Sequence, residues 1–377
     1  MERIKDFALT KMMRVCSRFP LTEQVESSAF QTGGVTRCSG STPETVMPRI
    51  IHVLKRLVLM VVGFACLIDP ASAADQPKRL KVVASFLPAY CFAANISGGL
   101  ADVENLLPSG VNPHEFQLSS RDLKRLEQAD LLIVNGLKLE EWLMKVISRL
   151  PARKRPRVVE CSAGMEDMLI YSRSGASHSG HGHAHGHGPG HEEGKQSKQP
   201  RKAGKEDRDA NPHVWLDPRL AMRAVSNITE AIVTLDGGRS VQYRAHRDAY
   251  IVKLTKLDED LLAGLKAVRS RSFVTLHDAF PYFVRRYDLK LTGVLEEVPE
   301  VSPSPRVLSD LIKRMRDEKS VAIFTEPGNT PGVARQLGRD MKLPVIELDT
   351  LETGPVAPDS YEIGMRRNLD VMARHLR

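Results

Sequence analysis

The sequence is poor in aromatic residues and in cysteine. Aromatic side chains make up 5% of the 377 residues, and the chain has five cysteines. Cys91 and Cys161, the two that follow residue 73, do not form a CxxC pair, which argues against a metal site built from thiolates. The sequence leaves open whether these two form a disulfide or stay as buried free thiols, because pairing depends on a distance that sequence does not reveal.

The apolar run near the start of the chain is too short to span a membrane. Leu57–Ile68 is a run of twelve apolar residues, whereas a membrane-spanning helix needs about 20. A basic segment, His52–Arg56, precedes the run, and the small residues Ala71–Ala73 follow it, which is the order of a secretory signal peptide. We therefore expect secretion, with cleavage after Ala73.

The predicted signal peptide covers residues 47–73 and begins late in the chain. Residues 1–46 show no hydrophobic period and no motif, so we expect them to be a non-native or disordered leader. The sequence leaves open whether the true start is Met1 or Met47.

The charge pattern lacks the footprint of a nucleic-acid-binding protein. The net charge is +8, but residues 1–73 contribute +3 and residues 172–210 contribute +2. No basic stripe interleaved with aromatic residues is present in the remainder, so we expect no nucleic-acid partner.

The HExxH motif of zinc hydrolases and the GxSxG motif of serine hydrolases are missing as well, and we expect a protein that is not an enzyme.

Short apolar runs alternate with amphipathic stretches from residue 80 onward, which predicts an α/β fold with parallel sheets. We expect an N-terminal lobe over 80–236 and a C-terminal lobe over 270–377, each with about four strands flanked by helices. The predicted strands are Leu80–Phe86, Asp102–Pro108, Asp130–Gly136, Arg157–Cys161, Ser272–Leu276, Lys290–Glu296, Val321–Glu326 and Pro344–Leu348.

One helix is predicted to be much longer than a sheet crossover requires. Over residues 240–268, Tyr250, Leu254, Leu257 and Leu261 recur at spacings of three and four and continue to Leu265 and Val268, which places them on one helical face. A helix of that length measures about 40 Å, so it indicates a rigid rod that joins the two lobes.

Three histidines and one aspartate are candidate metal ligands. His277 and Asp349 directly follow predicted strands, His114 lies in the loop after the second strand, and His213 lies where regular structure resumes. Ligands of open α/β sheets collect at the carboxyl ends of strands, and three imidazoles with one carboxylate complete a tetrahedral shell for Zn²⁺. His246 lies within the long helix among charged residues, so we expect it on a solvated face.

A polar insertion rich in histidine interrupts the N-terminal lobe at residues 172–210. Its composition predicts a disordered loop, because it contains too few apolar residues to offset the entropy of ordering. Neutral imidazoles on such a tether are suited to gather Zn²⁺ weakly, with an affinity that falls as pH drops through about 6.5. These auxiliary ligands are His178, His181, His183, His185, His187 and His191.

The motifs NPHEFQLSSRDLKRLEQADLLIVNG, NPHVWLDP, TLHDAFPYF and the FTEP…ELDTLE tail resemble the periplasmic solute-binding proteins of zinc and manganese ABC transporters. The resemblance implies two α/β lobes joined by a rigid backbone helix, a metal site between the lobes, and delivery of the metal to an inner-membrane permease with its ATPase. By motif, it implies His114, His213 and His277 as ligands, with Asp349 at the position of the fourth, which some members leave to water.

The resemblance and the residues together predict a monomeric periplasmic receptor for Zn²⁺. Manganese members tend to carry Glu where this chain has His277, and nitrogen ligands favour Zn²⁺. The alternatives are a receptor for Mn²⁺ or another divalent metal, a zinc hydrolase, and a metal buffer that acts through the histidine-rich loop.

Overall fold

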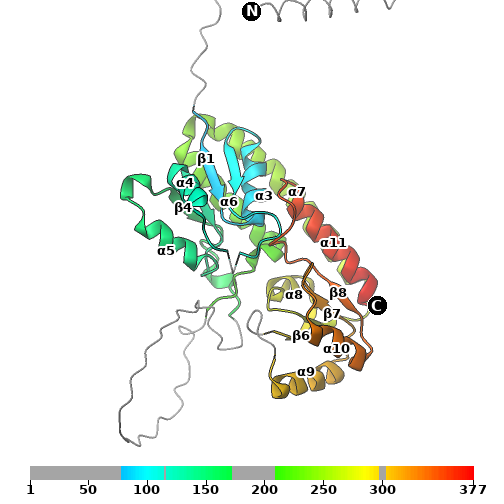
Figure 1. Ribbon diagram of the computed structural model, residues 1–377. Helices are drawn as coiled ribbons and strands as arrows, with labels where there is room; N and C mark the ends of the chain where they lie inside the picture. The colour runs from blue at the N-terminus through cyan, green and yellow to red at the C-terminus, as the bar shows by residue number, and fades with distance from the viewer. Residues whose placement is uncertain (1–77, 114–115, 172–208, 297–302) are drawn as a thin grey trace, which may run out of the picture. The chain divides into compact units, whose positions relative to one another are not determined.

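The computed structural model describes residues 78–113, 116–171, 209–296 and 303–377 (Figure 1). The predicted leader and signal peptide, the run of histidines from His178 to His191, and His114 lie outside the described residues. Among the residues described, no helix combines the length and apolar character that a membrane crossing requires.

The N-terminal half contains a four-stranded parallel sheet with strand order β2-β1-β3-β4. The chain reverses its direction of travel across the sheet between β1 and β3, which makes that boundary the topological switch point of the first sheet. The strands are β1 (Lys81–Ala84), β2 (Asp102–Asn105), β3 (Leu131–Val134) and β4 (Arg157–Glu160). The helices between them are α3 (Leu87–Ser97), α4 (Ser120–Gln128) and α5 (Glu141–Arg149), and α6 (Pro218–Leu235) follows.

Helices cover both faces of the first sheet, and alternate side chains of its strands divide between them. Val82 and Ile133 belong to the large core that includes α3 and α6, whereas Val83 and Leu132 pack in a smaller core with α4 and α5. Burial on both faces explains why β3 is an unbroken apolar run, LLIV, instead of an alternating pattern.

The C-terminal half repeats this arrangement with strand order β6-β5-β7-β8, also parallel. Phe273 and Phe324 contribute to the large core, and Val274 and Ile323 face α9 and α10 on the other side of the sheet. The strands are β5 (Ser272–Thr275), β6 (Lys290–Val294), β7 (Ile323–Thr325) and β8 (Val345–Glu347). The helices are α8 (Pro281–Tyr287), α9 (Pro305–Asp317), α10 (Gly332–Met341) and α11 (Ser360–His375).

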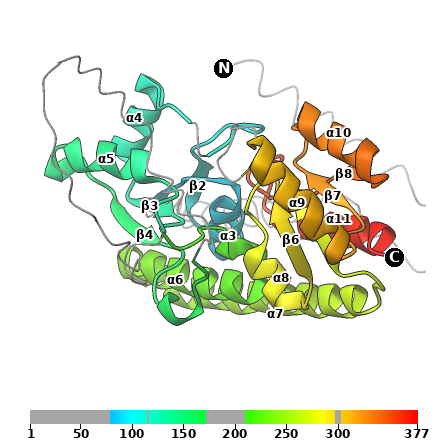
Figure 2. The same ribbon diagram turned by 90° about the horizontal axis from the view of Figure 1, so that it is seen from below.

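The long helix α7 (Ser240–Lys266) contacts helices of both halves. It packs against α3 and α6 beside the first sheet and against α8 and α11 beside the second, as Figure 2 shows. Tyr250, Leu254, Leu257, Leu261 and Leu265 are buried along one face, as the sequence predicts. Their side chains make the large core continuous between the two halves.

The predicted fold class is therefore confirmed: two four-stranded parallel sheets flanked by helices accompany one long helix. Each strand lies within the segment predicted for it, and α7 ends two residues before the predicted end of the long helix. Val268 falls beyond the end of α7 and is half-buried. Cys91 and Cys161 are both buried free thiols, and the Cys91 thiol donates to the Ala357 carbonyl at 3.3 Å.

The expectation that His246 lies on a solvated face is wrong. The His246 ring is half-buried, and its Nδ1 lies 3.1 Å from the Ile96 carbonyl at the end of α3. Gly98 caps α3 in the left-handed region, and a Cβ there would lie 2.2 Å from the His246 ring. The ring therefore occupies the space that glycine leaves at this helix end.

Candidate metal centre

His213 lies in an irregular segment between the first sheet and α6. Asp217 caps α6 by accepting a hydrogen bond from the Arg219 amide at 2.9 Å, and Pro218 occupies the first turn. Trp215 anchors the segment: its indole donates to the Thr350 carbonyl at 2.8 Å, and the Tyr361 hydroxyl donates to the Trp215 carbonyl at 2.7 Å. His213 is 2% exposed, so its ring is held among these contacts away from solvent.

His277 lies just past the carboxyl end of β5, and Glu326 directly follows β7, the neighbouring strand. The chain reverses direction across the second sheet between β5 and β7, which is where open α/β sheets place their ligands. His277 Nδ1 forms a hydrogen bond with Glu326 Oε1. A carboxylate accepts only, so Nδ1 carries the proton and Nε2 presents its lone pair to the site.

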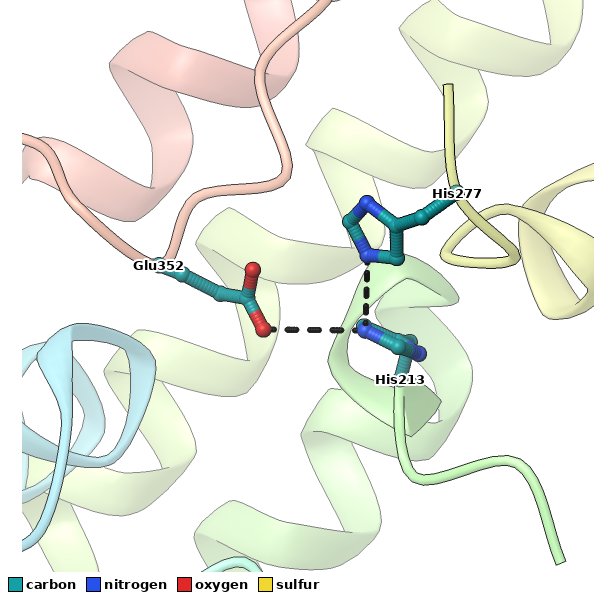
Figure 3. A group of neighbouring side chains, drawn as sticks. All are labelled: His213, His277 and Glu352. Carbon is teal, nitrogen blue, oxygen red and sulfur yellow. Dashed lines mark hydrogen bonds and ion pairs between the residues drawn. The ribbon is translucent and has the colours of Figure 1, made fainter. Parts of the chain in front are cut away.

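Glu352 supplies a carboxylate from the loop after β8 (Figure 3). The Thr350 hydroxyl donates to Glu352 Oε2 at 2.9 Å, which fixes the direction of the carboxylate. Its other oxygen, Oε1, lies 3.6 Å from His213 Nε2. Glu352 is 4% exposed, so a negative charge there requires a cationic partner nearby.

Three ligand atoms converge within 4.8 Å of one another, one each from His213, His277 and Glu352. The Nε2 atoms of the two histidines lie 3.2 Å apart (Figure 3). Two nitrogen lone pairs and a carboxylate oxygen repel one another unless a cation lies between them. The described residues therefore build a site for a shared proton or for a metal ion with nitrogen and oxygen ligands.

The electrostatics of His277 follow from its acidic surroundings. Burial lowers the pKa of the imidazole, but the hydrogen bond and charge of Glu326, with the charges of Glu352 and Asp278, raise it above the ordinary value of 6.5 overall. This ring attracts positive charge, whether a proton or a metal ion.

Asp349, the carboxylate suggested by the sequence, does not belong to the group of His213, His277 and Glu352. Asp349 Oδ1 accepts a hydrogen bond from the Leu351 amide at 2.7 Å, and a Cβ at Gly364 of α11 would lie 3.7 Å from Asp349 Oδ2. Leu351 has a positive φ of 65°, so the chain turns sharply before Glu352. Burial raises the pKa of Asp349, partly offset by the Leu351 amide.

His114 stays a prediction because it lies outside the described residues, yet its flanking segment is placed. The Gly110 amide donates to the Thr353 carbonyl at 2.7 Å, and the Ser109 hydroxyl donates to the Gly354 carbonyl at 3.0 Å. The loop that leads to His114 is therefore tied to the residues directly after Glu352.

Sequence reasoning missed Glu352, Glu326 and the buried Asn211 beside His213. Glu326 could have been found, because it follows a strand at the switch point in the same way that His277 does. Glu352 lies on an irregular turn without hydrophobic periodicity, so no pattern marks it. Asn211 lies within the NPHVWLDP motif, although nothing in the sequence shows what its side chain contacts.

The fold and this group of side chains define a two-lobed α/β protein with a candidate site for a divalent cation. The sequence profile of the family described as "Zinc-uptake complex component A periplasmic" matches residues 82–375, and the chain belongs to this family.

Individual relatives agree with this assignment. The chain is 28% identical over 324 residues to the "Zinc-binding protein AdcA" of Streptococcus pyogenes serotype M3, an alignment that covers 85% of this chain and 60% of AdcA. It is 27% identical over 334 residues to the "High-affinity zinc uptake system protein ZnuA" of Bacillus subtilis, covering 85% of this chain and 95% of that protein. The solved structure of the SBP FpvC from Pseudomonas aeruginosa in complex with Mn²⁺ superimposes with a TM-score of 0.64 at 25% identity, covering 79% of this chain and 98% of FpvC.

Proposed function

We propose that this protein is a periplasmic receptor that captures Zn²⁺ and delivers it to an ABC-type importer. The observation that carries the proposal is the convergence of His213 Nε2, His277 Nε2 and a Glu352 oxygen. The relatives support it: the B. subtilis protein, nearly all of whose length aligns, is named for high-affinity zinc uptake. The chain spans 60% of the length of AdcA, so only part of that relative has a counterpart here.

The proposed ligand set is His114, His213, His277 and Glu352. Glu352 takes the place that the sequence suggested for Asp349, because its carboxylate faces His213 whereas that of Asp349 is held by the Leu351 amide. His114 belongs to the set because the segment before it is hydrogen-bonded to the residues after Glu352. Three imidazoles and one carboxylate match the preferences of Zn²⁺.

The alternative within the same family is a receptor for Mn²⁺. FpvC, the structural neighbour described above, was solved with Mn²⁺, so the fold alone does not select the metal. Nitrogen ligands favour Zn²⁺ over Mn²⁺, and His213 and His277 each have an acceptor at Nδ1, which directs Nε2 toward the site. Competition between the two ions for the purified protein distinguishes these proposals.

Two other functions make different demands on the protein. A zinc hydrolase needs an open coordination position and a general base, and predicts turnover of esters or peptides that His277→Ala abolishes. A metal buffer needs the histidine-rich run, and predicts that deletion of residues 178–191 removes nearly all binding. A receptor is expected to show no turnover and to keep one tight site after the deletion.

The cellular setting follows from the same proposal. Residues 47–73 would direct export and be cleaved after Ala73, and the mature protein would act as a monomer that docks on the permease. N-terminal sequencing of the protein recovered from the periplasm tests the cleavage site directly.

Zinc titration by calorimetry tests the function itself. Wild-type protein is expected to bind one Zn²⁺ tightly, and both His213→Ala and His277→Ala are expected to lose that site. Lys256→Ala, an exposed change on α7, is the control and should bind normally. Unchanged stoichiometry and affinity in both histidine variants would refute the proposal.

A further inference from the structure

The Asn211 side chain contacts His213 and the backbone carbonyl of the residue that follows His277. Its Oδ1 accepts a hydrogen bond from the His213 amide at 3.0 Å and lies 3.0 Å from His213 Nδ1. Its Nδ2 donates to the carbonyl of Asp278 at 2.6 Å, and Asp278 directly follows His277. One side chain, 1% exposed, thus joins the two segments that carry the imidazoles.

The hydrogen bonds fix which way the Asn211 amide points. If its oxygen and nitrogen were exchanged, the nitrogen would face the His213 amide N–H and the oxygen would face the Asp278 carbonyl, and both contacts would be repulsive. Oδ1 therefore faces His213, and it can only accept. His213 Nδ1 must carry a proton to make this contact, which leaves the lone pair of the neutral ring on Nε2.

The backbone of Asn211 is held as firmly as its side chain. The Asn211 amide donates to the Ile170 carbonyl at 2.8 Å. The hydroxyl of Tyr282, on α8 of the C-terminal half, donates to the Asn211 carbonyl at 2.7 Å and accepts from the Ile170 amide at 3.1 Å. Asn211 is consequently hydrogen-bonded to residues of both halves of the chain.

We propose that Asn211 is a positioning residue for the metal centre, one that selects the Nδ1–H tautomer of His213 and couples this histidine to His277. The inference rests on the proposed function. It goes further by assigning the tautomer of His213, and the link between the His213 and His277 segments, to one uncharged amide. A partner that orients a metal-binding histidine typically contributes about 10–100-fold to metal affinity.

The test measures the tautomer and the affinity separately. Long-range ¹H–¹⁵N spectra of the metal-free full chain, labelled at histidine, report which ring nitrogen carries the proton, and His213→Gln assigns the His213 signals. Competition with a chromophoric chelator reports the affinity for Zn²⁺. The variants are Asn211→Ala, which removes both contacts, and Asn211→Asp, which keeps the acceptor that faces His213 but replaces the donor to the Asp278 carbonyl with an oxygen.

Asn227→Ala is the matched control. Asn227 lies on α6, and its Nδ2 donates to the Cys161 and Ala163 carbonyls at 3.0 and 2.9 Å. This variant removes side-chain hydrogen bonds to the backbone without touching either histidine. Its thermal unfolding shows how much a purely structural loss of this kind changes the protein.

The expected wild-type spectrum shows His213 protonated at Nδ1. Asn211→Ala should give a mixture of tautomers and bind Zn²⁺ about 10–100-fold more weakly, whereas Asn227→Ala should bind within about twofold of wild type. Asn211→Asp should restore the Nδ1–H tautomer.

Three results would overturn the inference. These are a wild-type His213 protonated at Nε2, an Asn211→Ala protein that keeps both the tautomer and the affinity, and an Asn211→Asp protein with mixed tautomers. Failure of the proposed function is distinguishable, because a wild-type protein without tight Zn²⁺ binding would still report its tautomer. If Asn211→Ala does not fold, the wild-type and Asn211→Asp spectra still decide the question.

Discussion

At the scale of single residues, each group in the candidate centre has a partner that directs it. Asn211 faces His213 Nδ1, Glu326 faces His277 Nδ1, and the Thr350 hydroxyl holds the second oxygen of Glu352. Such partners orient the atom of each side chain that faces the site and reduce the reorganisation that binding requires.

Glu352→Gln and Asp349→Asn test which carboxylate belongs to the centre. Removing the Glu352 charge is expected to weaken Zn²⁺ binding at least as much as losing an orienting partner, about 10–100-fold, because its oxygen faces the histidines. Asp349→Asn keeps an oxygen that can accept from the Leu351 amide, so its affinity should stay within about threefold. Chelator competition measures both, and a larger loss in Asp349→Asn would contradict the assignment.

Because Glu140 is buried, we expect the stability of the protein to depend on pH even without bound metal. The Glu140 carboxylate ties the ends of β1 and β3 by accepting from the Ser85 hydroxyl at 2.6 Å and the Asn135 amide at 2.8 Å. Burial raises its pKa from 4.5 to about 7, against these hydrogen bonds. Between those values the folded protein binds more protons than the unfolded chain, so stability falls as pH rises.

The free energy of unfolding is expected to fall by on the order of 3 kcal/mol as pH rises from 4.5 to about 7. Urea unfolding of the metal-free protein at several pH values measures it, with Glu140→Gln as the comparison. The variant is expected to be less stable overall, because an amide cannot replace every acceptor, but the difference from wild type should shrink as pH rises. Parallel pH profiles for the two proteins would contradict the prediction.

The sequence predicted two of the three grouped side chains, His213 and His277. His277 could be chosen because an apolar run places it at the carboxyl end of a strand, and His213 because its motif marks the return of regular structure. Glu352 could not, because it reaches the site through the left-handed Leu351 and the hydrogen-bonded turn at Asp349. Backbone turns of this kind leave no periodic signal in the side chains.

At the scale of elements, α7 links helices of the two halves through one buried carboxylate. Asp258 accepts from Arg286 Nε at 2.9 Å and from the Tyr287 hydroxyl at 3.1 Å, both on α8, and from Arg219 Nε on α6 at 3.3 Å. Helix α6 follows His213 and α8 follows His277 in the chain. Burial raises the pKa of Asp258, but these partners outweigh it and lower the pKa overall, so the carboxylate is ionised.

Asp258→Ala is expected to lower the free energy of unfolding by about 3 kcal/mol, because it leaves the mostly buried Arg286 without its charge partner. Asp260→Ala is the matched control on the same helix. Asp260 pairs with Lys256 and Arg366 at the surface, where such pairs contribute about 1 kcal/mol or less. Urea unfolding compares the two variants. Equal decreases in the free energy of unfolding would show that the hydrogen bonds of Asp258 stabilise the protein no more than the surface pairs of Asp260.

Elements were predictable where burial gives a clear pattern. Strands such as β3 are apolar on both faces, and α7 has a regular buried stripe, so both could be identified. Helix α4 begins with a capping box in which Ser119 and Asp122 exchange hydrogen bonds. His246 was misassigned because its charged neighbours suggested exposure, whereas the space that it fills is created by Gly98 on another helix.

At the scale of the whole described molecule, one large core runs from the first sheet through α7 to the second. A shared core couples the stability of the two halves, in contrast to two domains joined by a flexible linker. The ligands of the candidate centre come from segments that this core supports on both sides. The sequence predicted the two sheets and the long helix, but not that their cores are continuous, because that depends on contacts between distant segments.

The metal-free protein is therefore expected to unfold in a single cooperative transition. Free Zn²⁺ at a hundredfold excess over its Kd should add about 2.7 kcal/mol of stability by binding only the folded state. Differential scanning calorimetry with and without Zn²⁺ measures both effects, and His213→Ala should show no shift. Two resolved transitions in the metal-free protein would contradict the shared core.

The proposed function requires that side chains from both halves of the chain bind one Zn²⁺. Anomalous diffraction at the zinc edge from crystals of the zinc-loaded protein tests it most directly. One strong peak is expected about 2.0–2.2 Å from Nε2 of His213, Nε2 of His277 and an oxygen of Glu352. A fully occupied zinc peak elsewhere, with those three side chains unliganded, would contradict it.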